Sequence, residues 1–179
     1  MSSARAIVLL LVVMGCAAPE GERAAGEDTA APAAAGVPAG TRTLGELGRT
    51  AMLEVLLGET GEEKKVWFAI GPGDRETAAL KNAFAAVFAE AGWEIHTDVV
   101  TGMVLRPGLM FLMAETEEQS APYVHTAREA IQASGLEVKA ASEYRPYYED
   151  RRRENPNYVG IAMAPEQAFA FVIGPRPTS

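Results

Sequence analysis

The residues best suited to binding lie together in one stretch, residues 144–158. This stretch holds four of the five tyrosines of the chain, and four arginines. Tyrosine and arginine are enriched at contact hot spots, because one offers a rigid amphipathic ring and the other a planar guanidinium. The candidate partner-binding residues are Tyr144, Tyr147, Tyr148, Arg151, Arg152, Arg153 and Tyr158. The alternative is a solvated loop whose arginines are neutralised by Glu149, Asp150 and Glu154.

A second group could carry out metal or proton chemistry. Glu94, His96 and Asp98 alternate along the chain, so a strand would place all three side chains on one face. Such a row can bind a metal ion or pass protons. An edge strand also presents rows of this kind simply as its solvated side. A small enzyme or metal-dependent factor centred on this face is therefore the alternative hypothesis for function.

The rest of the sequence carries no catalytic motif. Gly71-Pro72-Gly73-Asp74 stands between a predicted strand and a predicted helix, where phosphate-binding loops occur. Pro72 has no N–H to offer a phosphate, however, and Asp74 would place a carboxylate against it. No serine lies in a Gly-x-Ser-x-Gly elbow. The sequence therefore predicts neither catalysis nor a cofactor.

Two similar halves are expected to position these groups. Residues 66–70 and 93–99 are predicted strands, joined by a helix for which Asp74 is the N-cap. The same order returns as strands 109–113 and 136–140 with helix 121–134 between them. A shift of 43 residues superposes Phe68 on Phe111 and Gly92 on Gly135. Two successive βαβ halves predict an α+β fold, a ferredoxin-like two-layer sandwich with both helices on one face.

Two further elements are expected outside the halves. Residues 43–57 carry leucine and valine at helical spacing and predict an extra N-terminal helix, although Gly45 and Gly48 weaken that prediction. Residues 168–173 predict a C-terminal strand, either alone or in a hairpin with residues 159–163.

The two halves resemble an uncharacterised α/β domain that is common at the C-termini of bacterial membrane-attached proteins. The shared features are a strand with a Gly-Asp turn, a helix ending in Ala91-Gly92-Trp93, and the closing Val172-Ile173-Gly174-Pro175-Arg176-Pro177. The resemblance covers about residues 65–177 and brings no catalytic residues with it.

The N-terminus indicates export. Arg5 precedes an apolar run, residues 6–13, that is too short to span a bilayer and matches the core of a signal peptide. Val13-Met14-Gly15-Cys16 follows and resembles the lipobox of bacterial lipoproteins. That resemblance implies cleavage before Cys16 and a diacylglyceryl group on its sulfur. The alternative is an ordinary secretory signal, with Cys16 as a free thiol that has no partner for an internal disulfide.

Composition divides the chain into three parts: a signal peptide at residues 1–15, a tether at 16–40 and a single globular domain at 41–179. The tether begins with the lipidated cysteine and consists mainly of Ala, Pro, Gly and acidic residues. Such a segment cannot bury enough apolar surface to fold, so we expect a flexible tether. Its typical reach as a coil is about 25–30 Å.

Charge and sorting complete the functional prediction. The formal net charge of −8 argues against nucleic acid and against electrostatic docking on anionic lipid. Ala17 after the cysteine implies, by the sorting rule of the lipoprotein family, an outer-membrane location facing the periplasm in a cell with two membranes. The sequence thus predicts a lipid-anchored cell-envelope protein whose domain binds or scaffolds without catalysis. The expected partners are the membrane, through Cys16, and an envelope protein or cell-wall glycan.

Overall fold

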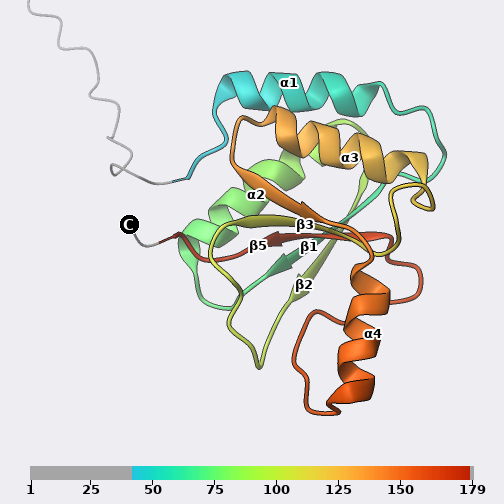
Figure 1. The fold of residues 1–179 in the computed structure, drawn as a ribbon. Coiled ribbons are helices and arrows are strands. Elements are labelled where there is room, and N and C mark those ends of the chain that lie inside the picture. The colour runs from blue at the N-terminus through green and yellow to red at the C-terminus, as the bar shows by residue number, and fades with distance from the viewer. Residues whose placement is uncertain (1–41, 178–179) are drawn as a thin grey trace, which may run out of the picture. The chain divides into compact units, whose positions relative to one another are not determined.

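Four helices and five strands occur along residues 42–177, which are the residues that the computed structural model describes (Figure 1). The helices are α1 (Glu46–Leu57), α2 (Arg75–Glu90), α3 (Pro122–Ala133) and α4 (Tyr144–Glu154). The strands are β1 (Lys65–Ile70), β2 (Glu94–Val99), β3 (Leu109–Met113), β4 (Val138–Ala141) and β5 (Phe169–Ile173). The signal peptide, the lipid site at Cys16 and the tether predicted from the sequence lie outside the described residues.

The strands form one mixed sheet in the order β2-β1-β5-β3-β4. β1 pairs with β2 and β3 pairs with β4, both in parallel, so the two βαβ halves and the α+β class are confirmed. β5 lies between the halves, parallel to β1 and antiparallel to β3. The ferredoxin-like detail is not confirmed. In that fold each βαβ unit is split by a strand of the other, whereas here the strands of each unit are direct neighbours.

The C-terminal strand forms without the hairpin. Residues 159–163 adopt no strand, and Ile161 and Met163 instead pack on the sheet beside Val172. The chain after β5 passes close to the segment that leads into β3. A Cβ at Gly174 would lie 1.8 Å from the Arg106 carbonyl oxygen, so only glycine fits there. This contact fixes the segment before β3 against the end of β5.

Helix α2 begins where the sequence predicts. The Asp74 carboxylate accepts hydrogen bonds from the backbone N–H groups of Glu76 and Thr77, at 2.9 and 3.3 Å. The Thr77 hydroxyl donates a third hydrogen bond to it at 2.8 Å. These hydrogen bonds, the one from the Thr77 hydroxyl above all, lower the pKa of Asp74. The predicted N-cap is confirmed.

The main core lies between the sheet and helices α1, α2 and α3, which cover one face of the sheet (Figure 1). It is largely aromatic. The Phe84 ring meets the Phe171 ring edge-on with centroids 5.0 Å apart, and the Phe111 and Phe169 rings stack at 4.7 Å. Fully burying a side chain of this size contributes about 1.5–3 kcal/mol, so this face supplies most of the stability of the fold.

Helix α1 packs against both α2 and α3. It starts at Glu46, three residues later than expected, and buries Met52 and Leu56 in the core. At Gly48 the helix approaches the end of α3 so closely that a Cβ would lie 2.2 Å from the Ser134 carbonyl oxygen. The glycine that weakened the sequence prediction therefore permits the packing of this helix.

The other face of the sheet is covered by loops and by α4 (Figure 1). Ala69, Ala170 and Val172 face this side, and Leu105 and Ile161 pack over them. The Tyr/Arg stretch, for which a solvated loop was the alternative, begins as the regular helix α4. No helix within residues 42–177 combines the length and the apolarity needed to cross a bilayer.

Candidate functional site

An open groove lies on the loop-covered face of the sheet. Its volume is about 650 Å³, within the range of about 300–1,000 Å³ that is typical of ligand sites. Met110, Leu112 and Val172 of the sheet form its floor. Its walls are residues 103–106, residues 141–144 with Tyr147 at the start of α4, and residues 158–161.

The start of α4 is held in place by contacts with two other segments of the same chain, near Glu115 and Gln167. Glu143 adopts the left-handed conformation, with φ 58° and ψ 31°, and is the one non-glycine residue of the described range with positive φ. Its N–H donates to the Glu115 carbonyl at 3.0 Å. The Arg145 guanidinium donates to the Gln167 carbonyl at 2.9 Å and lies 3.0 Å from the Glu115 carboxylate. The unusual backbone of Glu143, which costs about 1–3 kcal/mol, thereby turns α4 along the groove.

The tyrosines of the stretch gather around Gly160. The hydroxyl of Tyr144 accepts a hydrogen bond from the Ile161 N–H at 3.0 Å, and burial raises the pKa of this hydroxyl. A Cβ at Gly160 would lie 3.0–3.2 Å from the side chains of Tyr158, Tyr148 and Tyr144. This packing ties residues 158–161 to α4, so the two walls of the groove support each other.

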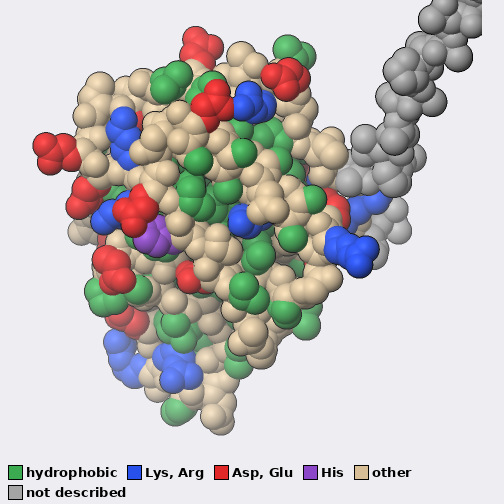
Figure 2. Space-filling model, turned by 180° about the vertical axis from the view of Figure 1, so that it is seen from behind, with side chains coloured by type: hydrophobic (Ala, Val, Ile, Leu, Met, Phe, Trp, Pro, Cys, Tyr) green, Lys and Arg blue, Asp and Glu red, His purple; other side chains and the backbone are tan. Residues whose placement is uncertain are grey.

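Tyr147 lies at the exposed edge of the groove. It is 47% exposed, and the Arg151 guanidinium lies over its ring, 5.4 Å from the centroid. The hydrogen bond with the Tyr158 hydroxyl, and then that with Arg151, lower the pKa of the Tyr147 hydroxyl. Seen from behind (Figure 2), basic and hydrophobic side chains lie side by side at the lower left of the molecule, over α4.

The structure thus divides the seven predicted binding residues into two sets. Tyr144, Tyr147 and Tyr158 line the groove. The others do not, and the arginines among them are engaged with neighbouring groups. Arg151 and Arg153 pair with acids of α4 at 3.3 and 2.7 Å, and Arg152 donates to the Tyr158 carbonyl at 3.4 Å. Neutralisation by neighbouring acids, the alternative interpretation, therefore describes Arg153 well.

The other groove residues are not among those predicted from the sequence. They are Met103, Leu105 and Arg106 before β3, with Met110 and Leu112 on β3 itself. One signal was available, because Met103-Val104-Leu105 is an apolar run between Gly102 and Pro107, where a plain connecting loop would be polar.

Two of the three predicted polar residues on β2, Glu94 and His96, form a pair. His96 Nε2 lies 3.0 Å from Glu94 Oε1, which is ion-pair distance although the two groups are not aligned as a hydrogen bond. The imidazole stacks on the Trp67 ring with centroids 5.2 Å apart. Within residues 42–177 no three His, Cys, Asp or Glu side chains are placed to share a metal ion, so Asp98 does not complete a site with this pair.

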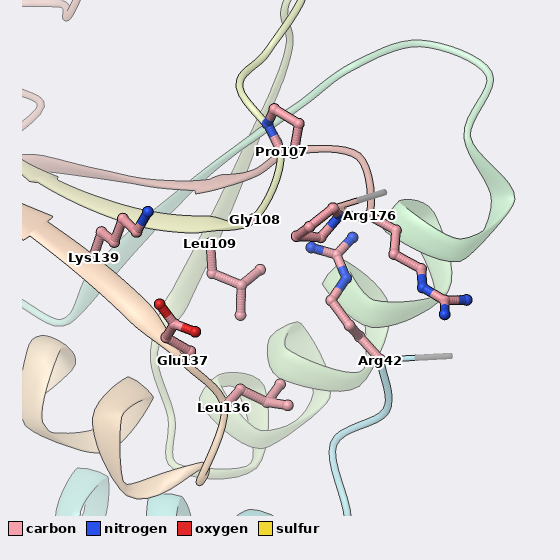
Figure 3. Close-up of a pocket in the computed structure, with 9 residues that line it drawn as sticks. Arg42, Pro107, Gly108, Leu109, Leu136, Glu137, Lys139 and Arg176 are labelled. Atoms are coloured by element: carbon pink, nitrogen blue, oxygen red, sulfur yellow. The ribbon is translucent and has the colours of Figure 1, made fainter. Parts of the chain in front are cut away.

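Figure 3 shows a second, smaller cavity of about 310 Å³. Arg42 and Arg176 lie on one side of it, and Lys139 and Glu137 on the other. Arg42 is engaged structurally, because its guanidinium lies 2.6 Å from the Glu76 carboxylate and donates to the Gly174 carbonyl at 2.9 Å. None of the predicted binding residues lines this cavity.

Comparison with known proteins leaves the site to be interpreted from its own chemistry. No protein-family model, curated protein or solved structure gives a significant match to this chain.

Proposed function

We propose that this chain is a cell-envelope protein held on a membrane by a lipid on Cys16, and that its α/β domain binds a ligand in the groove without catalysing a reaction. The location follows from the resemblance of residues 13–16 to a lipobox. The binding role follows from the groove itself.

One observation carries the binding role. Six large hydrophobic side chains are exposed in the described range, and three of them, Val104, Tyr147 and Val159, line this groove. Exposed apolar side chains that gather in a concave site are typical of ligand and partner surfaces. Because the same groove contains three of the predicted tyrosines, sequence and geometry favour the same place.

The lining favours binding over chemistry. Its polar side chains are Arg106, Ser142, Glu143 and the tyrosine hydroxyls, and it includes neither histidine nor cysteine. The Tyr144 hydroxyl is already used to hold Ile161. The lining combines an apolar floor with a few polar groups at its rim, which can orient a ligand.

The lipid on Cys16 would hold the protein on the membrane, and the tether would let the domain reach its ligands. A diacylglyceryl group with a further acyl chain holds a protein stably on a membrane. A domain on a flexible tether meets ligands of that membrane at high local concentration, so weak binding suffices. Envelope proteins and cell-wall glycan remain candidate partners.

The location is tested by feeding cells an alkyne-tagged palmitate. We expect the parent chain to take up the tag and the Cys16→Ser variant to lose it. A parent chain that stays untagged would remove the membrane from the proposal.

The binding role is tested by crosslinking intact cells and comparing the adducts of three chains by mass spectrometry. We expect Val104→Asp/Val159→Asp to lose the adducts of the parent, because two charges then stand in the apolar groove. Leu47→Asp is the control, since Leu47 is 89% exposed, as Val104 is, but lies on α1. Identical adducts from all three chains would contradict a groove-centred function.

A further inference from the structure

The groove has an apolar interior built from flexible side chains. The floor and inner walls present the thioethers of Met103 and Met110 with the aliphatic groups of Leu105, Leu112 and Ile161. Methionine adapts its shape to a ligand more readily than branched side chains do. A long, flexible hydrocarbon fits such a surface better than a sugar, whose hydroxyls need hydrogen-bonding partners along the floor.

A positive charge stands at the rim of this apolar surface. Arg106 lines the groove, and among the described residues its guanidinium makes no ion pair. Arg151 lies over the Tyr147 ring at 5.4 Å, and its own partner, Glu154, is 3.3 Å away on the solvent side of α4. Arg106 belongs to the wall formed by residues 103–106, and Arg151 stands beside Tyr147, so positive charge lies at both of these places. Charge complementarity therefore calls for an anionic group there.

The one acidic side chain that lines the groove is that of Glu143. This residue immediately precedes α4, one turn before Tyr147, and is exposed to solvent. The rim is thus negative at the start of α4 and positive around Tyr147. This polarity favours one orientation, with the anionic head at Arg106 and the hydrocarbon running over Met110 and Leu112.

We propose that the groove binds a free fatty acid, with its carboxylate at Arg106 and its hydrocarbon chain on the methionine and leucine floor. This inference rests on the proposed function, because it names the ligand of the same groove. A second copy of the chain, a peptide and a glycan are outcomes of the test.

The test uses the full-length chain in phosphatidylcholine vesicles and a palmitic acid analogue that carries a diazirine and a terminal alkyne. Its methyl ester serves as the uncharged control. After irradiation, mass spectrometry locates the labelled residues. We expect the acid to label residues 103–112 or 144–161, unlabelled palmitate to compete, and the ester to label about tenfold less, because a hydrogen bond to a charged group is lost.

A matched pair of variants tests the position of the head group. Arg106→Gln should weaken labelling by the acid about tenfold and leave labelling by the ester unchanged. Arg153→Gln removes a guanidinium of the same protein that is 75% exposed and paired with Asp150, so it should have no effect. Equal loss in both variants would show a general charge effect and overturn the assignment to Arg106.

The other outcomes separate this inference from the function on which it rests. Equal labelling by acid and ester, or labelling spread over α1 and α3, overturns the fatty-acid assignment. If the acid fails to label while crosslinked adducts in cells still depend on Val104 and Val159, the groove binds a peptide, a glycan or a second copy. Loss of both signals removes the proposed function as well.

Discussion

The two faces of the sheet are built from the same strands but have opposite characters. On β5, Phe169, Phe171 and Ile173 face the helices, whereas Ala170 and Val172 face the loop-covered side, where Val172 lines the groove. On β1, the small Ala69 likewise faces the loop-covered side. Because strand residues alternate between faces, β5 presents its large side chains to the helices and its smaller ones to the loops. One face therefore provides most of the stability, and the other carries the groove for which we propose a binding role.

The largest effect is expected from removing a large side chain of the helix-covered face. Phe171 is fully buried, so Phe171→Ala should lower the free energy of unfolding by about 3–5 kcal/mol, through lost burial and a new cavity. Val172→Ala, the next residue, should cost less because its side chain already borders an open groove. Urea unfolding of both variants measures the difference, and equal losses would contradict the division between the faces.

A smaller loss is expected where the helix layer closes. Gly48→Ala should destabilise the protein by about 1–3 kcal/mol, because the added Cβ would meet the Ser134 backbone and push α1 from α3. Gly45→Ala is the control, since nothing lies within 4 Å of a Cβ at that position. Thermal unfolding should separate the two variants. If both variants unfold at the same temperature, the close approach of the helices is not a determinant of stability.

The N-cap of α2 should give an effect that depends on pH. Asp74→Ala should cost about 1 kcal/mol at neutral pH, because the N–H groups of Glu76 and Thr77 lose their acceptor. Since folding lowers the pKa of Asp74, its contribution is complete above the ordinary value of 3.8 and is lost as the pH falls below it. The parent and the variant should therefore converge in stability in acid. A difference that persists unchanged to low pH would contradict this role of the carboxylate.

The smallest effect is expected at the edge of the sheet, outside both faces. Glu94 and His96 are paired on β2 and no third ligand completes a metal site within the described residues. We therefore expect a chelator to leave the melting temperature unchanged. Metal analysis of the purified chain is the companion measurement. A stoichiometric metal, together with a lower melting temperature after chelation, would revive the alternative of a metal-dependent factor.

The stable face was more predictable from the sequence than the groove, for a physical reason. Strands β1 and β3 and helix α2 carry local signals, namely apolar periodicity, the Asp74 cap and the Gly92 stop. The position of β5 between the halves depends on pairing with strands that are far away in the sequence, so local patterns do not indicate it. Helix α4 buries none of its residues fully and therefore shows no apolar stripe, although Pro146 in its first turn is compatible with a helix.

The sequence predicts the site only in part, because the pairing of distant strands brings two of its walls together. The tyrosines of α4 were identified by composition. Residues 103–106 meet them only because β3 lies beside β5, which brings Gly174 against Arg106. Side chains alternate in size along Phe169-Ala170-Phe171-Val172, but which face of the sheet each one joins depends on the strands that lie on either side of β5.

The most direct test of the account is photocrosslinking in living cells from two positions of equal exposure. A photoreactive residue in place of Val104 stands at the groove, and one in place of Leu47 stands on α1; both parent side chains are 89% exposed. We predict a discrete adduct from position 104 that position 47 does not give. Adducts of equal yield from both positions, or from neither, would contradict a ligand-binding groove.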